Sequence, residues 1–550
     1  MSTYDKASLV LIPSGTKEGV VFSQKPTNGD GDFTFTRASS ATRVNSDGLI
    51  EKETQNLFLQ SNQFDTTWSP IGASVTSGQS GYDGSSDAWL LNKSLAGGFI
   101  QQSISSSGVQ TYSIYAKAGS LNYMRLRVSG SLSALVYFDF TDGSIHNNDG
   151  FDATMVSVGG GWYRCSYSFV STITAVQIYP ADSINSVSGA SGSIYIQDAQ
   201  LNQGLVADSY LETTTTAVYG GITDNIPRLD YTDASCPSLL LEPQRTNIID
   251  HSEYIDNLYH RSGSIITTNY GISPEGVQNS TRVQRGTSYD GYQYFRYTVS
   301  PSTTYTMSIY AKGSGTIRFN FYDGTSAQTN SLTNLTSEWV RYSFTATSNS
   351  TTSMGDFGFF ISDDAEVYGF QLEESSYVTS YIPTYGASVT RNSDITYKYN
   401  ATSIVGTTEG VMFIDCVPPA NDNPILMQLI NNTSIYSQSI YFEYAKSINK
   451  IRCNAYDSGV LQASFELDAT IGNQYKIALA YKENDFAFYV NGSLVGTDTN
   501  ASVQSGLQDV LIGVLKGSFG SYNFIGNDVN QAILFKTRLS NEELADLTTI

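Results

Sequence analysis

The sequence of 550 residues carries one set of landmarks twice, in the same order. Residues 111–117 (TYSIYAK) recur as residues 306–312 (TMSIYAK), and the same further landmarks surround each copy. These are residues 55–58 and 246–249, residues 161–167 and 338–344, and residues 195–213 and 368–384. Matched landmarks in one order indicate two copies of a single domain, each of about 150 residues, the size of one β-sandwich.

Within each copy, apolar and polar side chains alternate along short segments, which is the pattern of a half-buried strand. Tyr112, Ile114 and Ala116 point to one side of their segment, and the residues between them point to the other. Thr and 38 Tyr favour pleated surfaces, whereas Ser, Asn and Gly favour turns. We therefore expect an all-β protein built of antiparallel sandwiches, with almost no helix.

The C-terminal part has a different pattern. Residues 486–490 (FAFYV) precede Asn491-Gly492, and Asn-Gly between alternating segments is the strongest short-range signal of a hairpin. Residues 540–543 (SNEE) fit a capping box at the start of a short terminal helix. This part is expected to be a third sandwich closed by that helix.

These patterns divide the chain into five segments. Residues 1–52 are weakly patterned, so we expect an irregular N-terminal attachment region that needs a partner or the next domain to become ordered. Residues 53–214 and 239–390 are expected to form two tandem jelly-roll domains, joined by a linker at residues 215–238. Residues 391–550 are expected to form the third sandwich.

The net charge of −21 argues against nucleic acid and against an anionic membrane surface as partners. No segment approaches the roughly 20 apolar residues that span a bilayer, and the start of the chain lacks a secretory pattern, so we expect synthesis in a cytoplasm without export. Four cysteines without a CxxC pair favour buried free thiols, although Cys416 and Cys453 could pair if they face each other across two strands.

Two segments carry a resemblance to a known class of protein. Residues 35–50 (FTRASSATRVNSDGLI) and 240–247 (LLEPQRTN), the latter preceded by residues 228–231 (RLDY), look like signatures of bacteriophage virion proteins, including tail-fibre and head-fibre components. The two repeats resemble jelly-roll carbohydrate-binding modules, and residues 391–550 resemble a concanavalin-like or laminin-G-like domain.

The resemblance implies a fibre or surface decoration of a phage virion, made in the host cytoplasm. It would be a homotrimer, mounted on other capsid or tail proteins by its N-terminal region, with its sandwiches facing host-surface carbohydrate. An alternative is a dedicated receptor-binding adhesin of the tail-fibre or tailspike kind that recognises cell-surface carbohydrate.

Searches for catalytic patterns favour a protein that is not an enzyme and needs no cofactor. His146, His251 and His260 do not fall in metal-ligand or triad spacing. Concanavalin-like glucanases would carry an E-x-D-x-x-E strand, but here Glu466-Leu467-Asp468 is followed by Ile471 at the position of the second Glu. A polysaccharide-degrading enzyme is therefore the disfavoured alternative.

Sugar rings stack on exposed aromatic side chains, which makes such residues the candidates for a glycan site. We predict the platform residues Trp68, Trp89, Tyr292, Tyr294 and Tyr297. Trp162 and Trp339 stand at matched positions of the repeats and are expected to be core residues instead.

A structural calcium ion often braces jelly-roll modules, and the resemblance places a ligand at Asp198. The second copy has Gln371 and Glu373 in the corresponding segment, so the ligand pattern is not repeated there.

Overall fold

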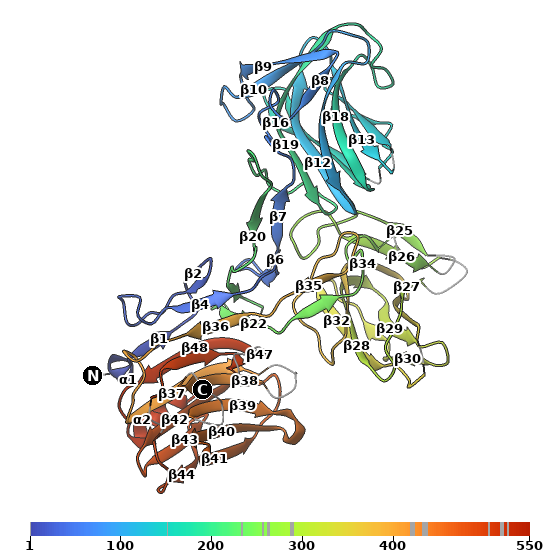
Figure 1. Ribbon diagram of the computed structural model, residues 1–550. Coiled ribbons are helices and arrows are strands. Elements are labelled where there is room, and N and C mark those ends of the chain that lie inside the picture. Colours follow the sequence, from blue (N-terminus) through green and yellow to red (C-terminus); the bar gives the residue numbers. More distant parts are fainter. Residues whose placement is uncertain are drawn as a thin grey trace.

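The computed structural model describes residues 2–131, 133–150, 152–232, 235–255, 258–260, 264–286, 291–351, 353–418, 424–431, 438–503, 506–516, 522–524 and 527–550. The protein is all-β and consists of three sandwiches (Figure 1). Two short α-helices, α1 (Thr3–Lys6) and α2 (Asn541–Thr548), and a 3-10 helix at Lys446–Ile448 are its described helical elements. Neither α-helix has the length and apolar character that crossing a bilayer requires.

The first jelly roll consists of two antiparallel sheets around one apolar core. Its first sheet has the order β16 (Asp152–Gly159), β17 (Trp162–Val170), β12 (Val109–Ala118), β19 (Gly192–Gln203), β10 (Ala88–Lys93), β9 (Ala73–Gln79). Its second sheet has the order β15 (Ile145–His146), β14 (Ala134–Asp139), β13 (Tyr123–Gly130), β18 (Ile173–Ala181), β11 (Phe99–Ser106), β8 (Ser69–Ile71).

The second jelly roll repeats this plan around its own core. One sheet has the order β32 (Val340–Thr347), β28 (Thr304–Ser314), β34 (Asp364–Glu373), β26 (Thr281–Gln284), β25 (Ile265–Thr267). The other has the order β30 (Ala327–Thr329), β29 (Thr316–Tyr322), β33 (Gly355–Ile361), β27 (Gly291–Tyr297), β24 (Tyr259–His260), and β31 (Thr333–Asn334) also pairs with β29.

The duplication predicted from the landmarks is present strand by strand. β17-β12-β19-β10-β9 corresponds to β32-β28-β34-β26-β25, and β14-β13-β18-β11-β8 corresponds to β30-β29-β33-β27-β24. The register of β12 on β19 shifts between Ser113 and Tyr115, and that of β28 on β34 shifts at the same place, between Ser308 and Tyr310. Even this local irregularity is therefore shared by the two copies.

The third sandwich draws on three separate stretches of chain. One sheet has the order β21 (Arg228–Asp230), β22 (Ser238–Leu241), β48 (Asn527–Phe535), β37 (Glu409–Val417), β42 (Tyr475–Lys482), β43 (Phe486–Val490), β44 (Ser493–Asp498), and β1 (Leu9–Leu11) also pairs with β48. The other has the order β2 (Thr16–Lys17), β3 (Val20–Val21), β4 (Phe33–Thr36), β36 (Ile395–Lys398), β45 (Asp509–Ile512), β38 (Ile425–Ile430), β39 (Ser439–Ala445), β40 (Lys450–Asp457), β41 (Val460–Asp468).

This arrangement corrects the expected N-terminal extension. Strands of residues 1–52 are integral to the third sandwich, and Leu9, Phe33 and Phe35 are buried in its core together with Leu239 and Leu241. The apolar side chains of these short strands gain their burial from strands some 500 residues away in the sequence, which a local pattern cannot reveal. The two jelly rolls are thus insertions into one sandwich that both ends of the chain complete.

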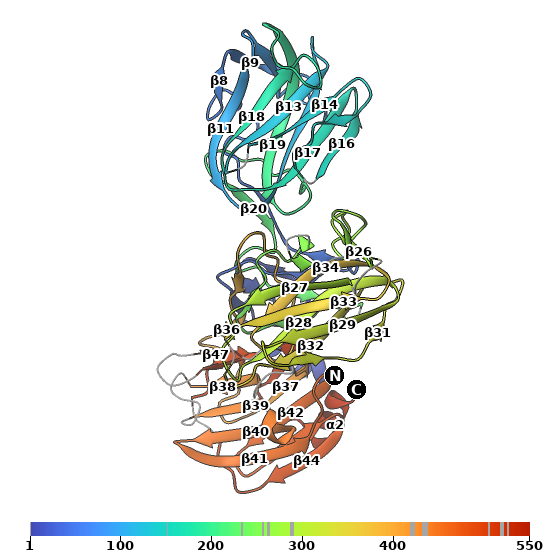
Figure 2. The same ribbon diagram turned by 90° about the vertical axis from the view of Figure 1, so that its right-hand side faces the viewer.

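Short two-stranded ribbons lead from this sandwich into the insertions. β7 (Glu53–Asn56) pairs with β20 (Val218–Gly221) below the first jelly roll, and β23 (Arg245–Asn247) pairs with β35 (Val389–Arg391) at the second (Figure 1). The remaining pairs are β5 (Arg43–Val44) with β6 (Ile50–Glu51) and β46 (Val514–Lys516) with β47 (Tyr522–Phe524). Figure 2 shows the first jelly roll standing apart at the top, and both termini at the third sandwich.

Several local predictions are confirmed. Asn491 and Gly492 have φ values of 48° and 79° between β43 and β44, as an Asn-Gly hairpin requires. Ser540 and Glu543 form the predicted capping box of α2. None of the four cysteines forms a disulfide, and Cys165, Cys416 and Cys453 are buried.

Candidate functional site

The predicted tyrosines lie on β27, and the pleat of that strand separates them. Tyr297 packs against the core of the second jelly roll, so Tyr292 and Tyr294 point to the opposite, outer side of the sheet. Their rings are stacked, with centroids 5.4 Å apart and planes within 14° of each other. Asn320 donates a hydrogen bond of 2.8 Å to the Tyr292 hydroxyl. The outer face of this sheet therefore contains two of the three predicted tyrosines.

An arginine continues this face on the next strands. Tyr292 pairs with Phe360 of β33, and Phe360 pairs in turn with Arg318 of β29. The guanidinium carbon of Arg318 lies 5.2 Å from the centre of the Phe360 ring. Beside them, Gly358 leaves room for the tyrosines, because a Cβ there would come within 2.9 Å of the Tyr292 ring. We call Tyr292, Phe360 and Arg318 the arginine–aromatic row of the second jelly roll.

The first jelly roll has the same row at the corresponding strands. Arg125 of β13 pairs with Tyr179 of β18, and its guanidinium carbon lies 3.6 Å from the centre of the Tyr179 ring. The ring of Phe99 from β11 lies on the other side of Tyr179, with centroids 4.6 Å apart. Gln177 accepts a hydrogen bond of 2.9 Å from the Tyr179 hydroxyl and donates one of 3.2 Å to Gln101. Phe99, Tyr179 and Arg125 thus match Tyr292, Phe360 and Arg318.

Sequence reasoning missed both arginines and the aromatic residues Phe99, Tyr179 and Phe360. A signal was present, because Met124-Arg125-Leu126 and Ile317-Arg318-Phe319 follow the repeated YAK motif by a few residues in both copies. The rows themselves join three strands that are far apart in the sequence, so only the sheet register brings them together.

The two predicted tryptophan platforms are wrong. Trp68 and Trp89 are only 1% and 4% exposed and belong to the core of the first jelly roll. The Trp68 ring lies 5.3 Å from Phe58, and its Nε1 donates to the Gln60 carbonyl oxygen at 3.2 Å. The segment before β8 packs Phe58, Phe64 and Trp68 into this core, and Trp89 joins them from the inner face of β10, where a large apolar ring gains most from burial.

The matched tryptophans behave differently from each other. Trp162 is buried, as expected, although it lies on the outer side of its sheet near Tyr82. Trp339 is only half-buried, donates to the Ile272 carbonyl oxygen and lies 5.0 Å from the Lys312 ammonium.

Asp198, the predicted calcium ligand, occupies the irregular point of β19. Its φ of 52° is left-handed, and the matching residue of the second copy is Gly369, with φ 66°. Its carboxylate accepts a hydrogen bond of 3.0 Å from the Tyr82 hydroxyl, and burial raises its pKa to about 6. Calcium needs oxygen acceptors, and within the described residues no group of three or more His, Cys, Asp or Glu could hold a metal ion. The calcium hypothesis thus gains nothing from this geometry and stays a prediction.

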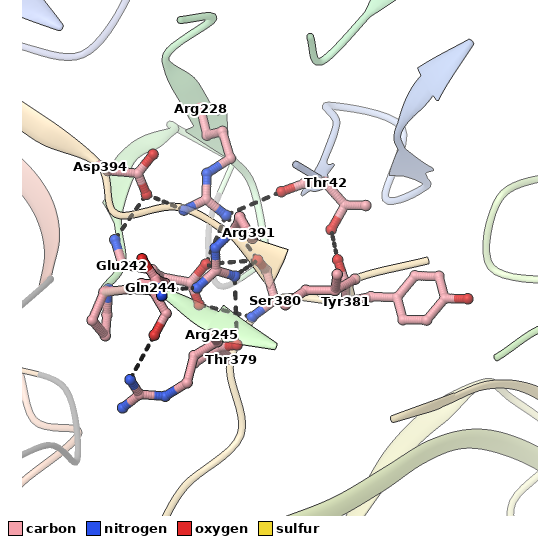
Figure 3. A network of polar contacts seen from close by, with 12 residues as sticks. Thr42, Arg228, Glu242, Gln244, Arg245, Thr379, Ser380, Tyr381, Arg391 and Asp394 are labelled. Atoms are coloured by element: carbon pink, nitrogen blue, oxygen red, sulfur yellow. Dashed lines mark hydrogen bonds and ion pairs between the residues drawn. The ribbon is translucent and has the colours of Figure 1, made fainter. Parts of the chain in front are cut away.

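The residues of the two signature segments meet in one buried ionic cluster, which we call the arginine junction (Figure 3). Its members are Arg37, Arg228, Arg391, Glu242 and Asp394. Arg228 and Arg391 each lie 2.7 Å from a Glu242 carboxylate oxygen, and Arg37 lies 3.1 Å from Asp394. The Arg228 guanidinium also pairs with Asp394. All three arginine side chains are fully buried or nearly so.

Each member stands where the chain crosses between sandwiches. Arg37 follows β4 on the way to the first jelly roll, and Arg228 lies in β21 on the way back. Glu242 follows β22 on the way to the second jelly roll, and Arg391 and Asp394 stand on the return to β36. The segments that resemble virion signatures are therefore the connections that hold both insertions to the third sandwich.

The charges of the junction keep one another ionised. Burial alone would raise the pKa of Glu242, but Arg391 and Arg228 outweigh it and hold that pKa well below its usual range. Burial also works to lower the pKa of Arg228, yet Asp394 and Glu242 raise it above its ordinary value. Burial is the main cause that lowers the pKa of Arg37 to about 10, which leaves it charged at neutral pH. Buried charges that pair with one another in this way fix a geometry rather than offer a binding site.

The residues considered as catalytic candidates in the sequence lie apart from one another or contact other side chains. Glu466 pairs with Lys450 and Arg452 at the surface of the third sandwich. His146 shares a hydrogen bond with Ser144, His251 lies 3.1 Å from Asp250, and the side chain of His260 lies outside the described residues.

No family model matches the chain, and no curated protein matches it. Similarity to solved structures covers about a quarter of the chain. The CBM40 of the Ruminococcus gnavus IT-sialidase, bound to alpha2,3 sialyllactose, is 15% identical with a TM-score of 0.25, over 27% of this chain and 87% of that one. Domain 4 of AbnA, a GH43 extracellular arabinanase from Geobacillus stearothermophilus in complex with arabinotriose, is 9% identical with a TM-score of 0.22, over 28% and 73%. Galectin LEC-6 from Caenorhabditis elegans is 13% identical with a TM-score of 0.18, over 23% and 83%.

Proposed function

We propose that this protein binds carbohydrate through the outer sheet faces of its two jelly rolls, without catalysing a reaction. The observation that carries the proposal is the arginine–aromatic row, which recurs at the same strands in both copies although few other side chains on these faces are the same. A repeated row on the outer side of a sheet is not needed to fill either core.

The chemistry of the faces suits sugar rings. Aromatic rings such as Phe99 and Tyr292 can stack on the C–H side of a pyranose, while the amides of Gln101 and Asn320 can pair with its hydroxyls. Two faces in one chain would also bind multivalent surfaces more tightly than either face alone.

A glycan array probed with the full chain tests this proposal. The double variant Phe99→Ala/Tyr292→Ala is expected to lose at least tenfold in apparent affinity for the glycans that the unchanged protein binds, because one stacking ring is removed from each face. The control Tyr219→Ala removes an exposed tyrosine of β20, away from both faces, and should leave binding unchanged. Unchanged binding of the double variant would refute the proposed site.

Our more specific proposal is that the protein is a structural component of a phage virion, either a decoration or a receptor-binding adhesin. It rests on the resemblance of residues 35–50 and 228–247 to virion signatures. Antibody labelling of particles would distinguish the two roles, since an adhesin belongs at the tail tip. Mass spectrometry of purified particles that lacked the chain would exclude both. The trimeric state, the virion partners and the synthesis in a host cytoplasm remain predictions of the same resemblance.

The truncation that would test the proposed mounting role needs a folding control. Removing residues 1–50 takes away β1 to β4, which complete the third sandwich. Failure of that variant to join particles would therefore be meaningful only if the variant still folds, and point substitutions on the exposed surface of these strands are the better test.

A further inference from the structure

In the described ranges of the chain, the two row arginines lack the carboxylate partner that holds several of the other arginines of the protein. Arg37, Arg228 and Arg391 are bound by buried carboxylates. Arg282 and Arg296 each form paired contacts with an aspartate. By contrast, within the part of the chain that the structure describes, neither Arg125 nor Arg318 has a carboxylate partner.

Arg125 and Arg318 have few hydrogen-bond acceptors for their guanidinium groups. Arg125 donates one hydrogen bond, of 3.4 Å, to the Tyr137 hydroxyl. For Arg318, no hydrogen bond to another described residue is present, and its guanidinium rests on the Phe360 ring. The Nε atoms of both arginines are buried without a hydrogen-bond partner, and among the described residues the terminal nitrogens have only the one bond to Tyr137. The fork of a guanidinium fits a carboxylate or an oxyanion of an ester. Both side chains are half-buried, which restricts the fork to the outer face.

The row arginines also differ from four other arginines that have no carboxylate partner among the described residues. Each of those four donates a hydrogen bond of 2.8 Å or shorter to another oxygen; they are Arg127, Arg164, Arg245 and Arg341. The outward carboxylates of the two sheets are engaged elsewhere, since Asp356 of β33 pairs with Arg296 and Asp139 of β14 accepts hydrogen bonds from Thr141. The same unpaired arginine at the same position of both copies indicates that this donor set is retained for something outside the chain.

We infer that the row arginines bind an acidic group of the glycan, a carboxylate or a sulfate ester, and that the faces prefer acidic over neutral sugars. This inference rests on the proposed carbohydrate binding and specifies its ligand class. The aromatic ring beneath each guanidinium fixes the plane of the fork, so that little conformational entropy is lost when an anion pairs with it. The neighbouring aromatic, Phe99 or Tyr292, then accommodates the sugar ring that carries the anion.

The test compares matched glycans on the full chain. Each acidic probe, one terminated by a carboxylate-bearing sugar and one by a sulfated sugar, is paired with its neutral parent of the same backbone. The unchanged protein is expected to bind at least one acidic member about tenfold or more tightly than its parent, the lower end of what a charge-assisted hydrogen bond supplies. The carboxylate and sulfate arms show which anion is bound.

The variant Arg125→Gln/Arg318→Gln should reduce this preference to within about twofold while keeping affinity for the neutral parent. The double Lys variant should retain part of the preference, because it keeps the charge but not the fork. The matched control Arg282→Gln removes an arginine that also lies over a ring, 4.7 Å from Tyr270, but is already paired with Asp364. It should leave the preference unchanged.

The outcomes separate the two levels of the proposal. Equal binding of acidic and neutral members, or a preference that survives the Gln variant, overturns the inference while carbohydrate binding stands. Binding of no glycan at all overturns the proposed function itself. Unchanged thermal unfolding of the Gln variant excludes a loss of binding through misfolding.

Discussion

At the scale of single residues, Asp198 and Gly369 are the matching residues of the two copies that adopt a left-handed backbone conformation. Both sit at the register shift between the central strands and both adopt positive φ. Glycine adopts this conformation without steric cost, and aspartate is among the few other residues that tolerate it. The first copy therefore keeps a buried carboxylate at a place where backbone geometry alone would favour glycine.

The raised pKa of Asp198 leads to a pH-dependent prediction. Because burial raises this pKa to about 6, the folded protein binds a proton here more readily than the unfolded chain does. The charged Asp198 therefore destabilises the folded state fully above about pH 6, and this destabilisation disappears as pH falls from about 6 toward 4. In the variant Asp198→Asn the side chain at this position is neutral at every pH, and asparagine also tolerates a positive φ.

We expect Asp198→Asn to stabilise the first jelly roll at pH 8 by up to about 3 kcal/mol and at pH 4.5 by only about 1 kcal/mol. Thermal unfolding at the two pH values measures this difference. Asp142→Asn, at an exposed turn of the same domain, is the control and should show no gain at pH 8. A gain for Asp198→Asn that is equal at both pH values would contradict the assigned cause.

Glu242 shows the opposite case of a buried carboxylate. Its pKa is lowered by Arg391 and Arg228, against the effect of burial, so its contribution to stability is present above its unfolded pKa and is lost only in strong acid. Glu242→Gln leaves three buried arginines with one carboxylate and is expected to destabilise the protein by roughly 3–5 kcal/mol.

Denaturant unfolding at neutral pH tests the effect of Glu242→Gln. Glu466→Gln removes a carboxylate that also contacts two basic side chains, but at the surface, and should cost about 0.5 kcal/mol or less. Similar small losses for both variants would show that the arginine junction does not stabilise the fold.

At the scale of strands and sheets, the sequence predicted the class, the duplication and the local turns. Alternation along residues 111–117 and the Asn491-Gly492 hairpin are local signals, so a single segment contains enough information to predict them. The duplication also made the order of the strands predictable, because each landmark in one copy indicates where the matching strand lies in the other copy.

Relations across strands could not be predicted in this way. The pairing of β1 with β48 joins segments with no pattern in common, and β1 has only three residues, too few to be recognised. Trp68 was misjudged because its burial depends on how the segment before β8 packs onto the core, whereas Trp89 shares the inward face of β10 with Leu91, a local signal that was overlooked. Tyr292 and Tyr294 were identified because they share one strand, whereas Arg318 and Phe360 come from two others.

At the scale of the whole molecule, the third sandwich is a scaffold and the jelly rolls are its insertions. The first jelly roll has its own core, and its two connections meet in the β7–β20 ribbon. We therefore predict that residues 53–221 fold alone into a monomer with a cooperative unfolding transition.

Residues 391–550 alone should not form a stable monomer, although the sequence suggested a separate domain there. This piece lacks the core residues Leu9, Phe33, Phe35, Leu239 and Leu241 and would expose one edge each of β36 and β48. Size-exclusion chromatography with light scattering, together with amide exchange, tests both fragments. A monomeric 391–550 fragment with protected strands would contradict the nested arrangement.

The pairing of β1 with β48 also sets an order of events in time. Ser8 donates a hydrogen bond to the carbonyl oxygen of Leu534, 526 residues later. A ribosome adding about 5–20 residues per second needs roughly 30–100 s to cover that distance. Both jelly rolls can be complete while the first strand of the third sandwich still lacks its partner. The two insertions can therefore fold on the nascent chain, and the sandwich that joins them is completed last.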